Sequence, residues 1–170
     1  MPRKRAIDWR VVVVLLCAWG LLIIRLGQPY YGLQEAFRVW IPAAVRNLSA
    51  YEFDDIRLLI TRDSAPVEPE NLTIYTNHPP FLVYTPALLA NVTGFNEVTM
   101  RFVFAAATWL GLVAFYVLVR RLYTARMALI AVGLLLLMPM VFFLGRVAGH
   151  DPLGWLFLML YGAVIVNWLR

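Results

Sequence analysis

The pattern of apolar and polar positions divides the chain into apolar runs and one long polar region. The first apolar run covers residues 11–24 and carries no charge. Three further runs follow in the second half of the chain, at about 98–119, 127–144 and 153–169. Each approaches the roughly 20 residues that an α-helix needs to cross a bilayer. The pattern therefore predicts a helical protein whose second half consists mainly of membrane helices.

Composition strengthens this prediction. The chain is 62% hydrophobic and 15% charged, with a mean hydropathy of +0.72. A soluble domain is nearer half apolar and about one quarter charged. The net charge of +5 comes almost entirely from arginine, and in a membrane protein such an excess indicates orientation. We therefore expect an integral membrane protein with membrane lipid, and no nucleic acid, as a partner.

The first apolar run has two interpretations. Basic residues precede it, and a secretory signal peptide begins in the same way. No small-x-small cleavage site follows the run, because the next residues are Arg25, Leu26 and Gly27. We favour an uncleaved anchor helix at about 9–26, with the N-terminus in the cytoplasm.

A polar outer loop, residues 27–97, connects the anchor to the later runs. Within it, residues 33–48 have the spacing of an amphipathic helix, whose apolar face comprises Phe37, Trp40, Ile41, Ala44 and Val45. Exposed apolar surface is unfavourable by about 25 cal/mol per Å², so we expect this face to pack on the span ends or on lipid. Residues 53–60 favour a second short helix.

Pro79 and Pro80 open a further apolar stretch, since proline is tolerated in a first helical turn. It runs to about Asn91, and Gly94 then ends it. About a dozen residues are too few to cross a hydrocarbon core of roughly 30 Å. If this stretch did span, the arginine-rich turn at 120–126 would face outward, against the positive-inside rule.

We therefore predict an all-α polytopic membrane protein with four transmembrane helices and an outer loop containing juxtamembrane amphipathic helices. Of the ten acidic residues, all but Asp8 then lie outside. Glu35 follows the first span, and Asp151 begins the fourth. Two such carboxylates can act as a base and its partner, or share a divalent cation.

Simpler roles exist for these residues. Asp151 before Pro152 suits a helix N-cap, Glu35 suits a solvated helix face, and His78 suits a loop. The sequence contains no Cys–His metal spacing, phosphate-binding glycine loop or nucleophile elbow. Glu35 and Asp151 are therefore singled out by their positions along the chain and not by a local motif.

Several short motifs occur in a characteristic order. They are Tyr75-Thr76-Asn77-His78-Pro79-Pro80-Phe81, Gly94-Phe95-Asn96-Glu97 with Arg101, Arg120-Arg121-Leu122-Tyr123, and Gly145-Arg146 with Asp151. Over about residues 32–168 this order resembles the N-terminal part of polytopic glycosyltransferases that use a lipid carrier, the GT-C fold. The resemblance is to the protein mannosyltransferase-like branch, which includes the aminoarabinose transferases acting on lipid A.

The resemblance implies transfer of a hexose or pentose from a polyprenyl-phosphate donor to a lipid, glycan or protein acceptor. The reaction would take place on the outer face of the plasma membrane. The family's catalytic acid in the first outer loop, usually an aspartate, best matches Glu35, and Asp54 or Asp55 is the alternative. The second outer acid matches Asp151.

The resemblance also suggests that His78, Arg101 and Arg146 bind substrate or the lipid phosphate. It identifies residues 1–170 as the N-terminal part of such an enzyme, because family members have many more spans. An alternative is a non-catalytic membrane subunit or lipid-binding module that keeps the first half of the fold. A transporter is less favoured, because the spans carry almost no charge.

Cysteine accessibility tests the orientation of the spans. With Cys17, the single cysteine, replaced by alanine, we expect Tyr123→Cys to react with a membrane-permeant maleimide and not with an impermeant one added outside. The arginine asymmetry places this turn in the cytoplasm. Labelling of residue 123 from outside intact cells would contradict the four-span topology.

Overall fold

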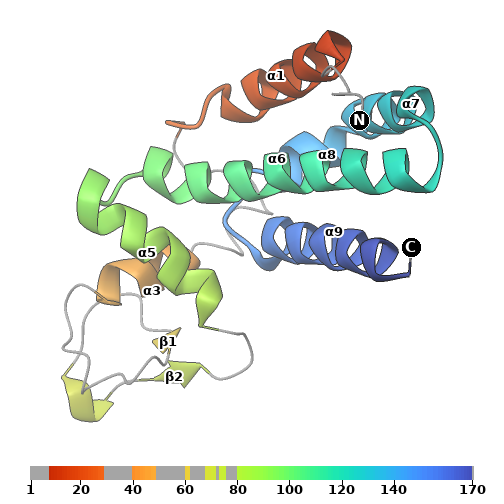
Figure 1. The fold of residues 1–170 in the computed structure, drawn as a ribbon. Coiled ribbons are helices and arrows are strands. Elements are labelled where there is room, and N and C mark those ends of the chain that lie inside the picture. The colour runs from red at the N-terminus through yellow and green to blue at the C-terminus, as the bar shows by residue number, and fades with distance from the viewer. Residues whose placement is uncertain are drawn as a thin grey trace.

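A computed structural model describes most of the second half of the chain and parts of the first. The described residues are 8–28, 40–48, 60–61, 68–71, 73–75 and 80–169. Five residues singled out in the sequence, Glu35, Phe37, Asp54, Asp55 and His78, lie outside these ranges. The described part is predominantly helical (Figure 1).

The central element is α6 (Glu97–Leu122), a helix of 26 residues and therefore about 39 Å long. The side chain of Asn96 caps its start by accepting the N–H of Thr99 at 2.9 Å. Arg120 and Arg121 occupy its last turn, where positive charge complements the helix dipole. Both ends of α6 are thus stabilised by residues adjacent to its apolar run.

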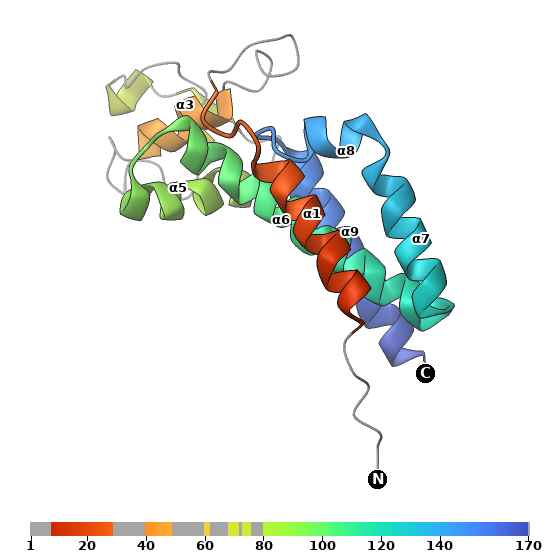
Figure 2. The ribbon, with the colours of Figure 1, turned by 90° about the horizontal axis from the view of Figure 1, so that it is seen from above.

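Three helices run alongside α6: α1 (Trp9–Ile23), α7 (Ala125–Leu136) and α9 (His150–Trp168) (Figure 2). Two described helices, α6 and α9, are long and apolar enough to cross a membrane, whereas α1 and α7 are shorter apolar helices. The helical membrane class agrees with the sequence. The number of four spans stays a prediction.

The third predicted span differs from the structure. We expected one helix over 127–144, but α7 ends at Leu136 and a separate helix, α8 (Pro139–Leu144), follows. Pro139 has no N–H to donate within a helix, and it forces the preceding residue out of the helical region. Met138 is accordingly extended, with φ −83° and ψ 114°. Figure 2 shows α8 turning away from the direction of α7.

The proline-led stretch forms the predicted short helix, α5 (Phe81–Thr93). Pro80 is its N-cap and Gly94, with φ 83°, ends it. A positive φ is readily adopted by glycine, which explains the stop. α5 has 13 residues, so it is about 20 Å long and too short to cross the bilayer core.

The outer loop contains α3 (Trp40–Leu48), a 3₁₀ turn η1 (Pro69–Asn71) and two short antiparallel strands, β1 (Ile60–Thr61) and β2 (Ile74–Tyr75). The strands were not predicted. The short helix expected over 53–60 is wrong at Ile60, which pairs with Tyr75 in the sheet. The rest of that stretch lies outside the described residues.

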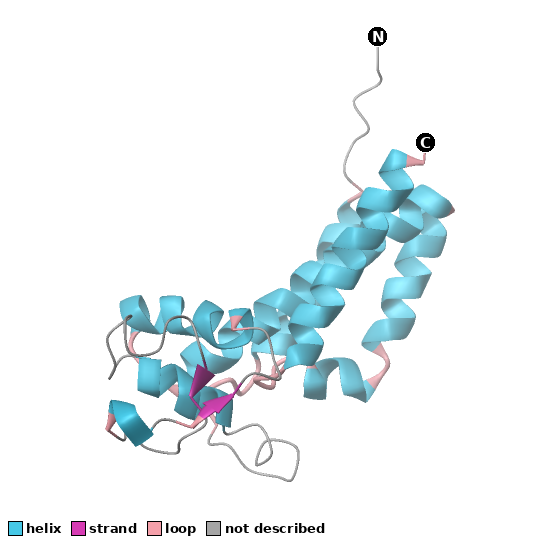
Figure 3. Ribbon diagram, turned by 90° about the horizontal axis from the view of Figure 1, so that it is seen from below, coloured by secondary structure: helices cyan, strands magenta, loops and turns pink. Residues whose placement is uncertain are grey.

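The apolar face of α3 packs as predicted. Ile41, Ala44 and Val45 belong to a buried cluster that also contains residues of α5, the start of α6 and the start of α9. Buried Asn47, on the same helix, donates from Nδ2 to Thr61 Oγ1 at 3.3 Å. The described part of the outer loop is therefore folded over the helix ends, where α3, α5 and the strands gather (Figure 3).

Polar and aromatic contacts join α1 to α6. The indole of Trp109 donates from Nε1 to the carbonyl oxygen of Leu15 at 2.8 Å. The ring of Trp19 makes edge contacts with Trp109 and with Phe102. Because the start of one helix lies beside the end of the other, α1 and α6 are antiparallel.

The contact between α6 and α9 depends on small residues. A Cβ added at Gly111 would lie 2.2 Å from Cδ1 of Trp155, and one at Gly162 would lie 3.1 Å from Leu118. Small residues allow close approach of helices in membranes. The paired positions increase together along both helices, so α6 and α9 are parallel. These directions are consistent with the four-span prediction.

Gly111→Ala tests this packing. The added methyl group would overlap the indole of Trp155, so we expect the free energy of unfolding to fall by about 1–3 kcal/mol. The matched control is Gly133→Ala in α7, where no atom of the described residues lies within 4 Å of an added Cβ. The control should be as stable as the parent or slightly more stable. Unfolding of the purified protein by SDS, followed by circular dichroism, measures both; equal stabilities would contradict the proposed contact.

Candidate functional site

Two arginines from distant parts of the chain meet the backbone that follows α1. Arg101, near the start of α6, donates from Nη1 to the carbonyl oxygens of Leu26, at 3.0 Å, and of Gln28. Arg146, between α8 and α9, donates from Nη1 to the carbonyl oxygen of Ile24 at 2.6 Å. The guanidinium of Arg101 is almost fully buried, since the residue is 3% exposed. Positive charge near a helix C-terminus is also favourable to the helix dipole.

The segment 145–149, which leads into α9, is bound to α6. The hydroxyl of Thr108 on α6 donates to the carbonyl oxygen of Gly145 at 2.6 Å. A Cβ at residue 145 would lie 2.8 Å from Cγ2 of Thr108, so glycine permits this approach. Val147 and Ala148 are buried in the segment that follows.

Asp151 lies in the first turn of α9, which begins at His150. The N-cap is Gly149, and no side chain makes a capping hydrogen bond there. The alternative role of Asp151 as the N-cap is therefore wrong. The carboxylate lies 3.5 Å from Nε2 of His150, and both side chains are partly or largely exposed. An exposed pair of this kind contributes little to stability.

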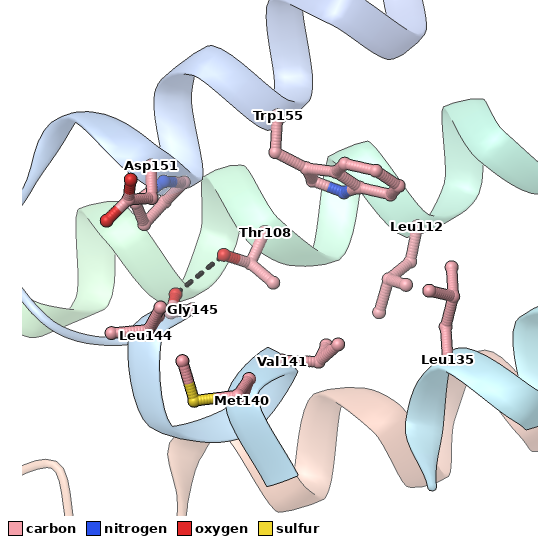
Figure 4. A pocket seen from close by; sticks show the side chains of 10 residues that line it. Thr108, Leu112, Leu135, Met140, Val141, Leu144, Gly145, Asp151 and Trp155 are labelled. Carbon is pink, nitrogen blue, oxygen red and sulfur yellow. Dashed lines mark hydrogen bonds between the residues drawn. The ribbon is translucent and has the colours of Figure 1, made fainter. Parts of the chain in front are cut away.

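A cavity of about 200 Å³ lies beside Asp151, between α6, α8 and α9 (Figure 4). Its walls are almost entirely apolar and include Leu112 of α6, Met140 of α8 and Trp155 of α9. The Thr108–Gly145 hydrogen bond closes part of its wall. The helix α8, which begins at the break at Pro139, contributes Met140, Val141 and Leu144 to the cavity wall.

A second, larger hollow of about 570 Å³ lies between α5, α6 and α9. It too is lined by apolar side chains, among them Leu88, Phe102 and Leu110. The rings of Phe81 and Phe157 meet across it, with centroids 5.6 Å apart. We call this hollow the α5 groove. The beginning of α9 separates the α5 groove from the cavity beside Asp151.

Burial raises the pKa of the Tyr84 hydroxyl on α5, so this side chain is a neutral phenol at physiological pH. Among residues 8–28, 40–48, 60–61, 68–71, 73–75 and 80–169, no group of three or more His, Cys, Asp or Glu side chains could hold a metal ion. A divalent cation shared by Glu35 and Asp151 stays a prediction, because Glu35 lies outside the described residues.

Three of the five predicted site residues, Arg101, Arg146 and Asp151, lie at one end of the helical bundle, where α1 ends and α6 and α9 begin. Glu35 and His78 lie outside the described residues. Sequence reasoning did not identify Thr108 and Trp155. The sequence feature that could have pointed to the cavity near them is Pro139, because it interrupts the third apolar run.

Comparison with known proteins identifies the family. A family model for dolichyl-phosphate-mannose-protein mannosyltransferases matches residues 77–169, which is more than half of the 170-residue chain and includes α5 to α9. No curated protein and no solved structure gives a significant match. The match agrees with the order of motifs and with the apolar helices of the structure. The chain belongs to the dolichyl-phosphate-mannose-protein mannosyltransferase family, of the GT-C type of membrane glycosyltransferases.

Proposed function

We propose that this protein takes part in transferring a sugar from a polyprenyl-phosphate donor to an acceptor at the outer face of the plasma membrane. The observation that carries the proposal is the family match over residues 77–169. The matched region contains Asp151 beside an apolar cavity at one end of the helices. A carboxylate at the edge of apolar surface suits a reaction between lipid-borne and polar groups.

In the proposed reaction, Glu35 takes the proton of the acceptor nucleophile or orients it, and Asp151 positions the acceptor. A general base needs to lie within hydrogen-bond reach of the proton that it removes, and its geometry matters before its pKa. The anchored segment 145–149 supports this role for Asp151, because firm placement of reacting groups lowers the barrier substantially.

The donor has a long apolar tail, and the α5 groove offers surface for it. The groove runs between α5, α6 and α9 and is lined by apolar side chains. Burying an apolar chain there is favourable by about 25 cal/mol per Å². The phosphate-binding role predicted for His78, Arg101 and Arg146 remains a prediction, as does the choice between a hexose and a pentose.

Substitution of the two acids tests the proposal. In membranes that contain the complete protein, we expect Glu35→Gln to abolish transfer from a radiolabelled polyprenyl-phosphate sugar, and Asp151→Asn to reduce it at least about a hundredfold. Both changes remove a charge and keep the shape of the side chain. Mannose, glucose and aminoarabinose donors should be tried in turn.

Glu70→Gln, in the exposed turn η1, serves as the matched control and should retain parent activity. Near-normal turnover in Glu35→Gln would remove that residue and leave Asp54 or Asp55 as candidates. Donor binding without transfer in the parent would favour the alternative of a non-catalytic lipid-binding subunit.

A further inference from the structure

The backbone just after α1 accepts hydrogen bonds from two separate elements. The carbonyl oxygens of Ile24, Leu26 and Gln28 lie within five residues of one another, and their donors are Arg101 and Arg146. These donors lie 73 or more residues further along the chain. Such contacts form only when α1, α6 and the segment before α9 are in their final arrangement.

The conformation of this backbone indicates that it is held in place. Arg25 has a φ of 61°, in the left-handed region that residues other than glycine seldom adopt. Such a conformation persists where the surrounding structure determines it. Leu26 is buried against Leu22 and Ala105, so the turn is fixed by apolar packing on one side and by arginine on the other.

The same contacts extend to Asp151. Arg146 lies next to Gly145, whose carbonyl oxygen is bound by Thr108. The buried residues Val147 and Ala148 follow, and α9 with Asp151 in its first turn comes directly after. One short segment is therefore tied to α6 by Thr108 and to the end of α1 by Arg146.

We propose that Arg101 and Arg146 form a clamp: they are positioning residues that fix the start of the outer loop relative to Asp151. This inference rests on the function proposed above. It assigns the two arginines to carbonyl groups of this chain, whereas the resemblance assigned them to the phosphate of the lipid carrier. Loss of Arg146 would let the segment 145–149 move relative to residues 24–28 while leaving the helices themselves intact.

Spin-label distances test the clamp without any assay of activity. Nitroxides are placed at Ile24→Cys and Gly154→Cys in a Cys17→Ala background, in lipid nanodiscs, and their separation is measured by double electron–electron resonance. Both side-chain positions are exposed, and within the part of the chain that the structure describes no atom lies within 4 Å of a Cβ at residue 154. We expect Arg146→Met to broaden the distance distribution about twofold, because local anchoring contacts limit such openings.

Four further variants complete the test. Arg126→Met, on the exposed face at the start of α7, should leave the distribution unchanged. Arg146→Lys keeps a charged donor, so its distance distribution should be closer to that of the parent than the distribution of Arg146→Met is. Thr108→Val, which loses the bond to Gly145, should broaden it as Arg146→Met does. Arg101 is buried, so circular dichroism first checks that Arg101→Met keeps parent helicity; its distance distribution should then broaden as well. Parent-like distributions in both Arg146→Met and Thr108→Val would overturn the clamp.

Kinetics separate positioning from phosphate binding. With the polyprenyl-phosphate sugar that the parent uses, Arg146→Met should lower kcat about 10- to 100-fold and leave the KM for the donor unchanged. Recovery in Arg146→Lys would support the clamp. A raised donor KM with an unchanged distance distribution would overturn it in favour of phosphate binding. If the parent transfers no sugar from any donor, the proposed function fails, and the distances alone decide the clamp.

Discussion

The turn that follows α1 contains carbonyl groups that need donors, and this requirement shapes the end of the helical bundle where α1 ends. α1 ends at Ile23, and the next carbonyl groups are bound by Arg101 and Arg146. Since Arg101 is near the start of α6, these bonds require α6 to begin where α1 ends. Since Arg146 precedes α9, they bring the start of α9 to the same place. Together with the contacts of Trp19 and Trp109, these bonds support the antiparallel pairing of α1 with α6, and they bring Asp151 to the same end of the bundle.

Local signals in the sequence predicted the elements that have local causes. Pro80 and Gly94 bound α5 because each restricts the backbone at its own position. The spacing of Ile41, Ala44 and Val45 predicted the buried face of α3 because a helix repeats every 3.6 residues. The continuous helix over 127–144 was wrong because the prediction followed the apolar composition of the run and gave less weight to the local effect of Pro139.

The features that could not be predicted depend on contacts between distant residues. The partners of Arg101 lie 73 and 75 residues away, and β1 pairs with β2 across the outer loop. The pattern of apolar residues within one stretch does not indicate which distant stretch will contact it. Asp151 was found from its position at the start of an apolar run, but its cavity was not, because the cavity requires α8 to leave the direction of α7. Thr108 and Trp155 become visible as site residues only when α6 and α9 are placed side by side.

The start of α9 separates the cavity beside Asp151 from the α5 groove. Asp151 and Trp155 lie on the side of the cavity, whereas Leu153 and Phe157 lie on the side of the α5 groove. A helix separates such faces because residues three or four apart share a side. A carboxylate repels the phosphate of a lipid donor, so the charged part of the donor is disfavoured in the cavity beside Asp151. Among the described residues that line the α5 groove there is no acidic side chain, so these residues can accept an apolar tail without that repulsion. Under the proposed function, the donor lipid would therefore lie on one side of α9 and the acceptor on the other.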